Sequence, residues 1–201
     1  ISIGRHGLIG KQNLYEHAWR LPFVACGPTV PHGRRAPGNI YLSDVFPTLC
    51  ELAGISAPPT VEGRSFRDVL EGRQPALRDV LYGVYSGGAQ PGIRCVREGD
   101  WKLIVYDNGR PEGRRLQLFN LRENPWELLP EHAAPEVVAA TAHRPSPIET
   151  DRSADPHCQD QLRRLQTLLL AEMRRYGDPA RLWIQPDSGA TSFSAAADGR
   201  G

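Results

Sequence analysis

The sequence predicts a mixed α/β fold, in which a region of loops and short helices is followed by a small antiparallel sheet and a packed helix. Between residues 43 and 54, apolar side chains recur at the spacing of a helix. From about residue 76 the chain changes to short β-branched and aromatic runs separated by glycine turns. From 159 to 176 apolar residues again follow a helical period.

The first part of the chain contains two predicted helices and one predicted strand. Residues 11–19 can form a short helix, and the apolar run 21–26 is typical of a buried strand. Residues 29–39 are rich in proline, glycine and arginine, which indicates a surface loop. The next helix is expected over 43–53, with Gly54 as its C-terminal cap.

The second part contains a predicted meander of four strands and one long helix. Glycine-containing turns between the apolar runs are typical of hairpins. Residues 130–157 are expected to be an irregular loop, and residues 186–201 a disordered tail. The strands are predicted at 80–85, 93–97, 101–106 and 116–120. The side chains of the helix expected to face the sheet are Leu162, Leu165, Leu169 and Met173.

Composition excludes some classes of partner. The chain has 201 residues, of which 40% are hydrophobic and 23% charged, and its formal net charge is +1. A nearly neutral chain has no general electrostatic attraction to nucleic acid. It also lacks the run of about 18 apolar residues that a membrane-spanning helix requires. We therefore expect no nucleic-acid partner and no membrane partner.

Four cysteines occur without a Cys-x-x-Cys pair, so a zinc ribbon is not expected. Four cysteines allow three disulfide connectivities, between which sequence cannot choose. Small buried thiols are the favoured interpretation. The cysteines are Cys26, Cys50, Cys95 and Cys158.

One segment, residues 4–16, carries a pattern with chemical meaning. Its glycines permit tight turns, and Lys11 follows the third of them where a short helix is predicted to begin. A helix N-terminus and a lysine together favour an anion such as sulfate or phosphate. His6 could donate a hydrogen bond from the same loop. The alternative is that Lys11 is solvated at an ordinary glycine turn.

Five phrases in order give the chain a resemblance to type I sulfatases, the arylsulfatase family of the alkaline phosphatase superfamily. The last of these phrases departs from the family pattern at three positions, Phe119, Asn120 and Asn124, where the usual residues are Tyr, Asp and Asp. The phrases are the glycine–lysine segment 4–16 with 20–24, the helix 44–54, the turn 58–66, the hairpin 94–104 and the segment 119–127.

The resemblance implies a fold, two site residues and a cofactor. Residues 1–75 would be the end of an alkaline-phosphatase-like α/β domain, and 76–185 a small sheet-and-helix subdomain. Lys11 matches the lysine that binds the sulfate group and helps to stabilise the leaving oxygen, and His6 matches a frequent histidine of that loop. The full-length parent would use Ca²⁺ to hydrolyse a small-molecule or carbohydrate sulfate ester, whereas no cofactor is expected for this fragment.

The nucleophile of that family is absent from the chain. It is made from Cys or Ser in the pattern C/S-x-P-S-R, and the nearest phrase here, 26–30, lacks the Ser and the Arg. The family's calcium-binding carboxylates are absent too. We therefore expect a fragment that is inactive alone, cut from a parent that could be periplasmic or secreted. Glu16 and Arg20 are interpreted as an ion pair within the short helix, and Lys102 as structural.

Two other interpretations remain open at this stage. Phosphodiesterases and phosphonate monoester hydrolases share the architecture and a similar glycine–lysine loop, so the chain could be a fragment of one of them. A non-catalytic binding or scaffolding module would instead be a closed fold with its own core.

Overall fold

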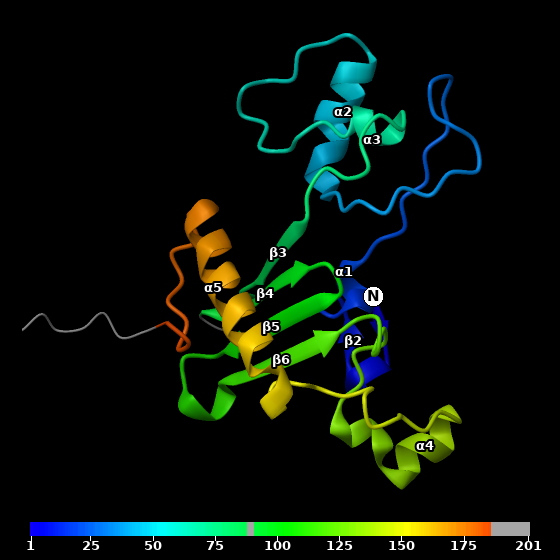
Figure 1. Ribbon diagram of the computed structural model, residues 1–201. Coiled ribbons are helices and arrows are strands. Elements are labelled where there is room, and N and C mark those ends of the chain that lie inside the picture. The colour runs from blue at the N-terminus through cyan, green and yellow to red at the C-terminus, as the bar shows by residue number, and fades with distance from the viewer. Residues whose placement is uncertain (88–90, 186–201) are drawn as a thin grey trace, which may run out of the picture.

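The computed structural model describes residues 1–87 and 91–185, and its centre is a four-stranded antiparallel sheet (Figure 1). The strands are consecutive neighbours in the order β3-β4-β5-β6, as a meander requires. All four predicted strands are confirmed, whereas the predicted disordered tail lies outside the described residues. The strands are β3 (Val80–Tyr85), β4 (Gly92–Glu98), β5 (Trp101–Asp107) and β6 (Arg115–Asn120).

The long helix α5 (Gln159–Arg175) covers one face of this sheet (Figure 1). Because side chains alternate between the faces of a strand, every second residue of each strand lies on the face that this helix covers. The four helix residues predicted to face the sheet are all buried, which confirms the amphipathic pattern. The core on this face contains Tyr82, Val96, Leu103, Val105, Leu118, Leu162, Leu165, Leu169 and Met173.

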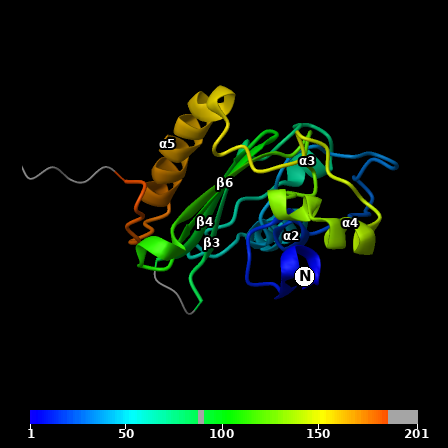
Figure 2. The same ribbon diagram turned by 90° about the horizontal axis from the view of Figure 1, so that it is seen from below.

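The N-terminal segment covers the opposite face (Figure 2). It consists of a two-stranded hairpin, β1 (Ser2–Ile3) and β2 (Ile9–Gly10), and one helical turn, α1 (Glu16–Trp19). Leu14 and Tyr15 lie between them and are buried. The sheet is therefore buried on both sides. The residues of the second core are Leu14, Tyr15, Cys95, Ile104 and Phe119.

Three predicted elements of the irregular regions differ from the structure. The helix expected over 11–19 is reduced to α1, since residues 11–15 follow the hairpin as loop. The strand expected over 21–26 is wrong, because this mostly exposed segment pairs with no strand of the described chain that could satisfy its backbone. The loop expected over 130–157 contains a 3-10 turn and a short helix. The remaining helices are α2 (Val45–Leu52), as predicted, α3 (Arg67–Leu70) and α4 (Pro135–Thr141).

None of the helices within residues 1–87 and 91–185 has the length and apolar character needed to cross a bilayer.

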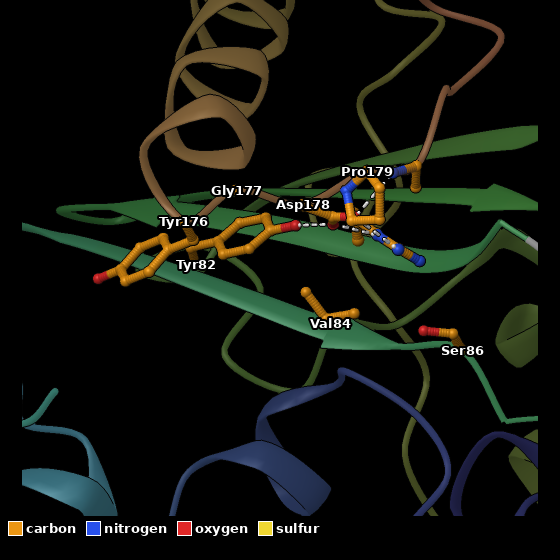
Figure 3. Close-up of a pocket in the computed structure, with 9 residues that line it drawn as sticks. Tyr82, Val84, Ser86, Tyr176, Gly177, Asp178 and Pro179 are labelled. Atoms are coloured by element: carbon orange, nitrogen blue, oxygen red, sulfur yellow. Dashed lines mark hydrogen bonds and ion pairs between the residues drawn. The ribbon is translucent and has the colours of Figure 1, made fainter. Parts of the chain in front are cut away.

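A cluster of polar side chains fastens the end of α5 to the sheet (Figure 3). Arg94 on β4 lies 2.8 Å from the carboxylate of Asp178, and Tyr82 on β3 donates a hydrogen bond to the same carboxylate. The hydrogen bond from Arg94 lowers the pKa of Asp178 to about 2. Tyr176 stacks on Tyr82 with ring centroids 5.6 Å apart. A pocket of about 540 Å³ lies here, but its charged groups already bind one another, so it is a structural junction.

All four cysteines are free thiols. Cys95 and Cys158 are buried, as favoured from the sequence, and burial raises the pKa of Cys95 to about 12. Cys26 is exposed and Cys50 is only half-buried, so the interpretation as buried thiols holds for two of the four.

Truncation of Leu165, which has no exposed surface, tests the packing of α5 on the sheet. Leu165→Ala should lower the free energy of unfolding by about 2–5 kcal/mol, because lost transfer energy and the resulting cavity add. Urea denaturation measures the change. Thr167→Ala, on the exposed side of the same helix, is the control and should change it by less than about 0.5 kcal/mol. Equal losses for both variants would contradict the packing.

Candidate functional site

The glycine-rich segment singled out from the sequence forms the N-terminal hairpin. Its strands pair Ser2 with Gly10 and Ile3 with Ile9, and a 3-10 turn over Arg5–Gly7 closes it. Gly10 has a φ of +101°, a conformation that other residues rarely adopt. The positive φ at Gly10, immediately before Lys11, therefore explains why the sequence has a glycine at this position.

Lys11 lies in the solvent-exposed loop directly after β2. Within the described part of the chain, its side chain forms no hydrogen bond or ion pair that would occupy the ammonium group. The predicted helix start at this lysine is wrong, because α1 begins only at Glu16. Any anion at this position would be bound by the ammonium group and the loop rather than by a helix N-terminus.

His6 points in a different direction, toward the C-terminal half of the chain. Its Nε2 donates a hydrogen bond of 2.8 Å to the backbone oxygen of Glu127, and its ring stacks on Tyr15 with centroids 4.1 Å apart. Burial lowers the pKa of His6, so the ring is neutral and Nδ1 is an acceptor. The structure does not bring His6 and Lys11 into contact.

A buried ionic network fixes the position of this N-terminal segment. Lys102 on β5 is fully buried, and its Nζ lies 3.0 Å from Glu16 and 2.8 Å from Glu127. Arg97 on β4 lies 2.8 Å from Glu16. The predicted pair of Glu16 with Arg20 is wrong, because the carboxylate faces the sheet and binds these two strand residues. The interpretation of Lys102 as structural agrees with this arrangement.

In this network the buried charge of Lys102 is compensated by the neighbouring carboxylates. Burial alone would lower the pKa of Lys102, but the adjacent carboxylates of Glu127 and Glu16 outweigh it and raise that pKa. Glu127 also accepts a hydrogen bond from the backbone N–H of Glu16 at 2.5 Å. Its φ of +53° is unusual for a residue with a side chain, and the network holds it there.

A pocket of about 970 Å³ lies between the hairpin, the sheet face beneath it and the segment 126–145. His6 lines this pocket and Lys11 does not. Sequence reasoning missed this cavity because its walls come from three distant parts of the chain. Arg5, Arg115 and Trp126 are the lining residues with the clearest capacity to recognise a ligand.

A metal site is not formed by the described residues. They contain no group of three or more His, Cys, Asp or Glu side chains arranged to hold an ion. Calcium in proteins takes six to eight oxygen ligands, so these residues do not fit the Ca²⁺ implied by the sulfatase resemblance. No chemistry of this segment is therefore assigned to a metal.

Comparison with known families decides the membership of the chain. Residues 4–146 match the model of the family described as N-sulphoglucosamine sulphohydrolase, C-terminal. The chain belongs to this family. The matched region contains Lys11 with strand β2, the complete four-stranded sheet and the ionic network, so the resemblance to sulfatases is confirmed.

Curated relatives of this family member are sulfatases. The arylsulfatase of Clostridium perfringens is 32% identical over 132 residues, covering 63% of this chain and 26% of the relative. The choline-sulfatase of Rhizobium meliloti is 34% identical over 129 residues, covering 63% and 24%. Arylsulfatase K of Mus musculus is 28% identical, covering 61% and 23%. The chain thus spans about a quarter of the length of these relatives.

Solved structures show the same fold. A putative sulfatase from Bacteroides thetaiotaomicron matches 83% of this chain and 32% of its own, with a TM-score of 0.58 and 21% identity. The phosphonate monoester hydrolase of Silicibacter pomeroyi matches 83% and 31%, with a TM-score of 0.57 and 18% identity. Both support the predicted alkaline-phosphatase-like fold class. The proposed boundaries at 75/76 and 185/186 stay predictions.

Removal of the buried cation tests the ionic network. Lys102→Met should destabilise the chain by about 3–5 kcal/mol, because two buried carboxylates lose their shared partner. Urea denaturation gives the stability, and hydrogen exchange of the Leu14 and Tyr15 amides reports release of the N-terminal segment. Arg122→Ala, which breaks an exposed pair with Asp100, is the control and should cost less than about 1 kcal/mol. A Lys102 variant as stable as this control would refute the role of the network.

Proposed function

We propose that this chain supplies the sulfate-binding lysine loop of a sulfate-ester hydrolase, with Lys11 contacting the sulfate group. The observation that carries the proposal is that the hairpin presents Lys11 to solvent with no partner among the described residues, while the segment after it is fixed by buried ion pairs. A lysine on a hairpin anchored in this way has an ammonium group available to an anion and a backbone held in a defined position.

The chemistry that Lys11 contributes follows from charge. When a sulfate ester is cleaved, negative charge develops on the leaving oxygen, and a nearby ammonium group stabilises that charge more than it stabilises the ground state. Lys11 would donate hydrogen bonds to a sulfate oxygen or to the bridging oxygen. His6 was expected to assist in the same loop. Its hydrogen bond to Glu127 favours a supporting role, in which it positions the hairpin.

The remainder of the catalytic centre must come from outside this chain. The sequence contains no C/S-x-P-S-R phrase for a nucleophile, and the described residues form no ligand set for Ca²⁺. We assign both the nucleophile and Ca²⁺ to the full-length protein that contains this chain.

An exposed apolar surface supports such a larger protein. Eleven of the sixteen exposed large hydrophobic residues within the described ranges fall in the first 55 residues. Soluble proteins rarely leave so much apolar surface exposed to water. The first quarter of the chain would pack against the rest of the catalytic domain. These residues are Ile1, Ile3, Ile9, Leu21, Phe23, Val24, Leu42, Phe46, Leu49, Leu52 and Ile55.

The substrate class is a small-molecule or carbohydrate sulfate ester. The name of the matched family contains an N-sulfated glucosamine, and one relative is a choline-sulfatase. The likeness to a phosphonate monoester hydrolase concerns the fold alone. Hydrolysis of phosphonate monoesters is therefore the second candidate reaction, behind sulfate-ester hydrolysis. A non-catalytic module is the third, and the exposed apolar surface argues against a closed fold of that kind.

The chain alone should show no sulfatase turnover, since it lacks a nucleophile. Purified protein assayed with 4-nitrophenyl sulfate and added Ca²⁺ tests this. The matched control is the Lys11→Ala variant of the same chain, which should give the same background. Turnover above that control would disprove the proposed division of the catalytic centre.

In the full-length protein, Lys11→Ala should lower kcat/KM by roughly ten- to a thousand-fold, with a loss in kcat as well as weaker binding. Steady-state kinetics on aryl sulfates of different leaving-group acidity measure it. The loss should be smaller for acidic leaving groups, which need less stabilisation.

Two further results of that experiment distinguish the possible roles of Lys11, which are sulfate binding alone and stabilisation of the leaving oxygen. Lys11→Arg should not restore full activity, because a planar guanidinium replaces a compact point donor poorly. Equal losses for good and poor leaving groups would show that Lys11 only holds the sulfate, and an unchanged kcat/KM would overturn its assignment.

A further inference from the structure

The pocket of about 970 Å³ has three walls that the fold brings together. Its base is one cross-strand row of the sheet, in which Ile93, Tyr106 and Arg115 are direct neighbours on the face away from α5. The turn of the N-terminal hairpin forms a second wall, and the segment 126–145 with α4 forms the third. Figures 1 and 2 both show α4 on the same side of the sheet as the hairpin. The volume lies in the range of small-molecule sites.

Two guanidinium groups at this pocket lack carboxylate partners. Arg5 lies 4.4 Å above the ring of Trp126, and Arg115 lies 5.3 Å from the ring of Tyr106. Within residues 1–87 and 91–185, neither arginine forms an ion pair, although many other arginines of the chain do. Glu131 is the one carboxylate in the described lining. Two arginines against one glutamate leave the described lining with a net positive charge.

The remaining lining would suit a ring. Aromatic and aliphatic side chains make up much of it, and arginine–aromatic stacks offer flat surfaces on which a ring can lie. Amide side chains from the hairpin segment add hydrogen-bonding capacity. The exposed Trp126 gives such a surface at low cost to folding. The lining residues of these kinds include Leu8, Gln12, Ile93, Tyr106 and Trp126.

We infer that this pocket is a binding site for an anionic ring compound, a sugar or aryl ring that carries a sulfate group. Arg5 and Arg115 bind the anion, and Trp126 contacts the ring. The choice of sulfate rests on the proposed function, whereas the pocket itself does not depend on it. Lys11 does not line the cavity, but Gln12 beside it and the turn of the hairpin do, so the pocket adjoins the lysine loop without including Lys11.

Titration of the 201-residue chain tests the inference. The probes are glucose 6-sulfate, 4-nitrophenyl sulfate, and glucose as the uncharged comparison. Binding is monitored through the NMR signals of the four tryptophan indole N–H groups. The Trp126 signal should shift with at least one sulfated probe and not with glucose. Arg5→Ala, Arg115→Ala and Trp126→Ala should each weaken binding at least fivefold. All three residues are exposed, so the variants should fold.

The controls separate this site from the lysine loop. Arg174→Ala, an exposed arginine of α5, is the matched control and should leave the affinity unchanged. A shift with the sugar probe alone or with the aryl probe alone supports the site and identifies the ring. Binding that is lost in Lys11→Ala but kept in Arg5→Ala would overturn the pocket and leave the proposed function standing. No shift of Trp126 with either sulfated probe at millimolar concentration would overturn the inference as well.

Discussion

The buried charge of Lys102 sets the arrangement of the two halves of this chain. A fully buried ammonium group is costly to desolvate unless carboxylates compensate it. Here the carboxylates come from Glu16, in the N-terminal segment, and from Glu127, after the last strand. Lys102 itself lies in a central strand of the sheet. One cation therefore joins three parts of the chain, and each part must be in place for the charge to be satisfied.

This requirement links the sheet to the lysine hairpin. The apolar residues Leu14 and Tyr15 supply the burial energy on that face of the sheet, but hydrophobic contacts are not directional. The ion pairs and the hydrogen bond from Tyr15 to Gln117 add direction, because each needs a specific distance and angle. The hairpin before them is thereby held in one orientation. The same contacts therefore fix the positions of Lys11 and of the hairpin residues that line the large pocket.

The two faces of the sheet have different functions. The face toward α5 is an apolar core closed by the Arg94–Asp178 junction, so it contributes stability. The opposite face combines a small core with the ionic network and the arginine-lined pocket. Membership of a sulfatase family gives this second face its significance, because both proposed anion contacts lie on or beside it.

The sequence by itself determined the elements whose signals are local. Period-two and helical apolar patterns with glycine turns located the four strands, α2 and α5. The glycine–lysine segment, with the family resemblance, marked Lys11 as a candidate residue. Tertiary structure alone decided the partners of Glu16, the orientation of His6 and the absence of a strand over 21–26. The contacts that fix Glu16 and His6 join residues 81 to 121 positions apart, such as Arg97 with Glu16 and His6 with Glu127. No local pattern encodes such a contact, because its energy exists only after the sheet and the hairpin have met.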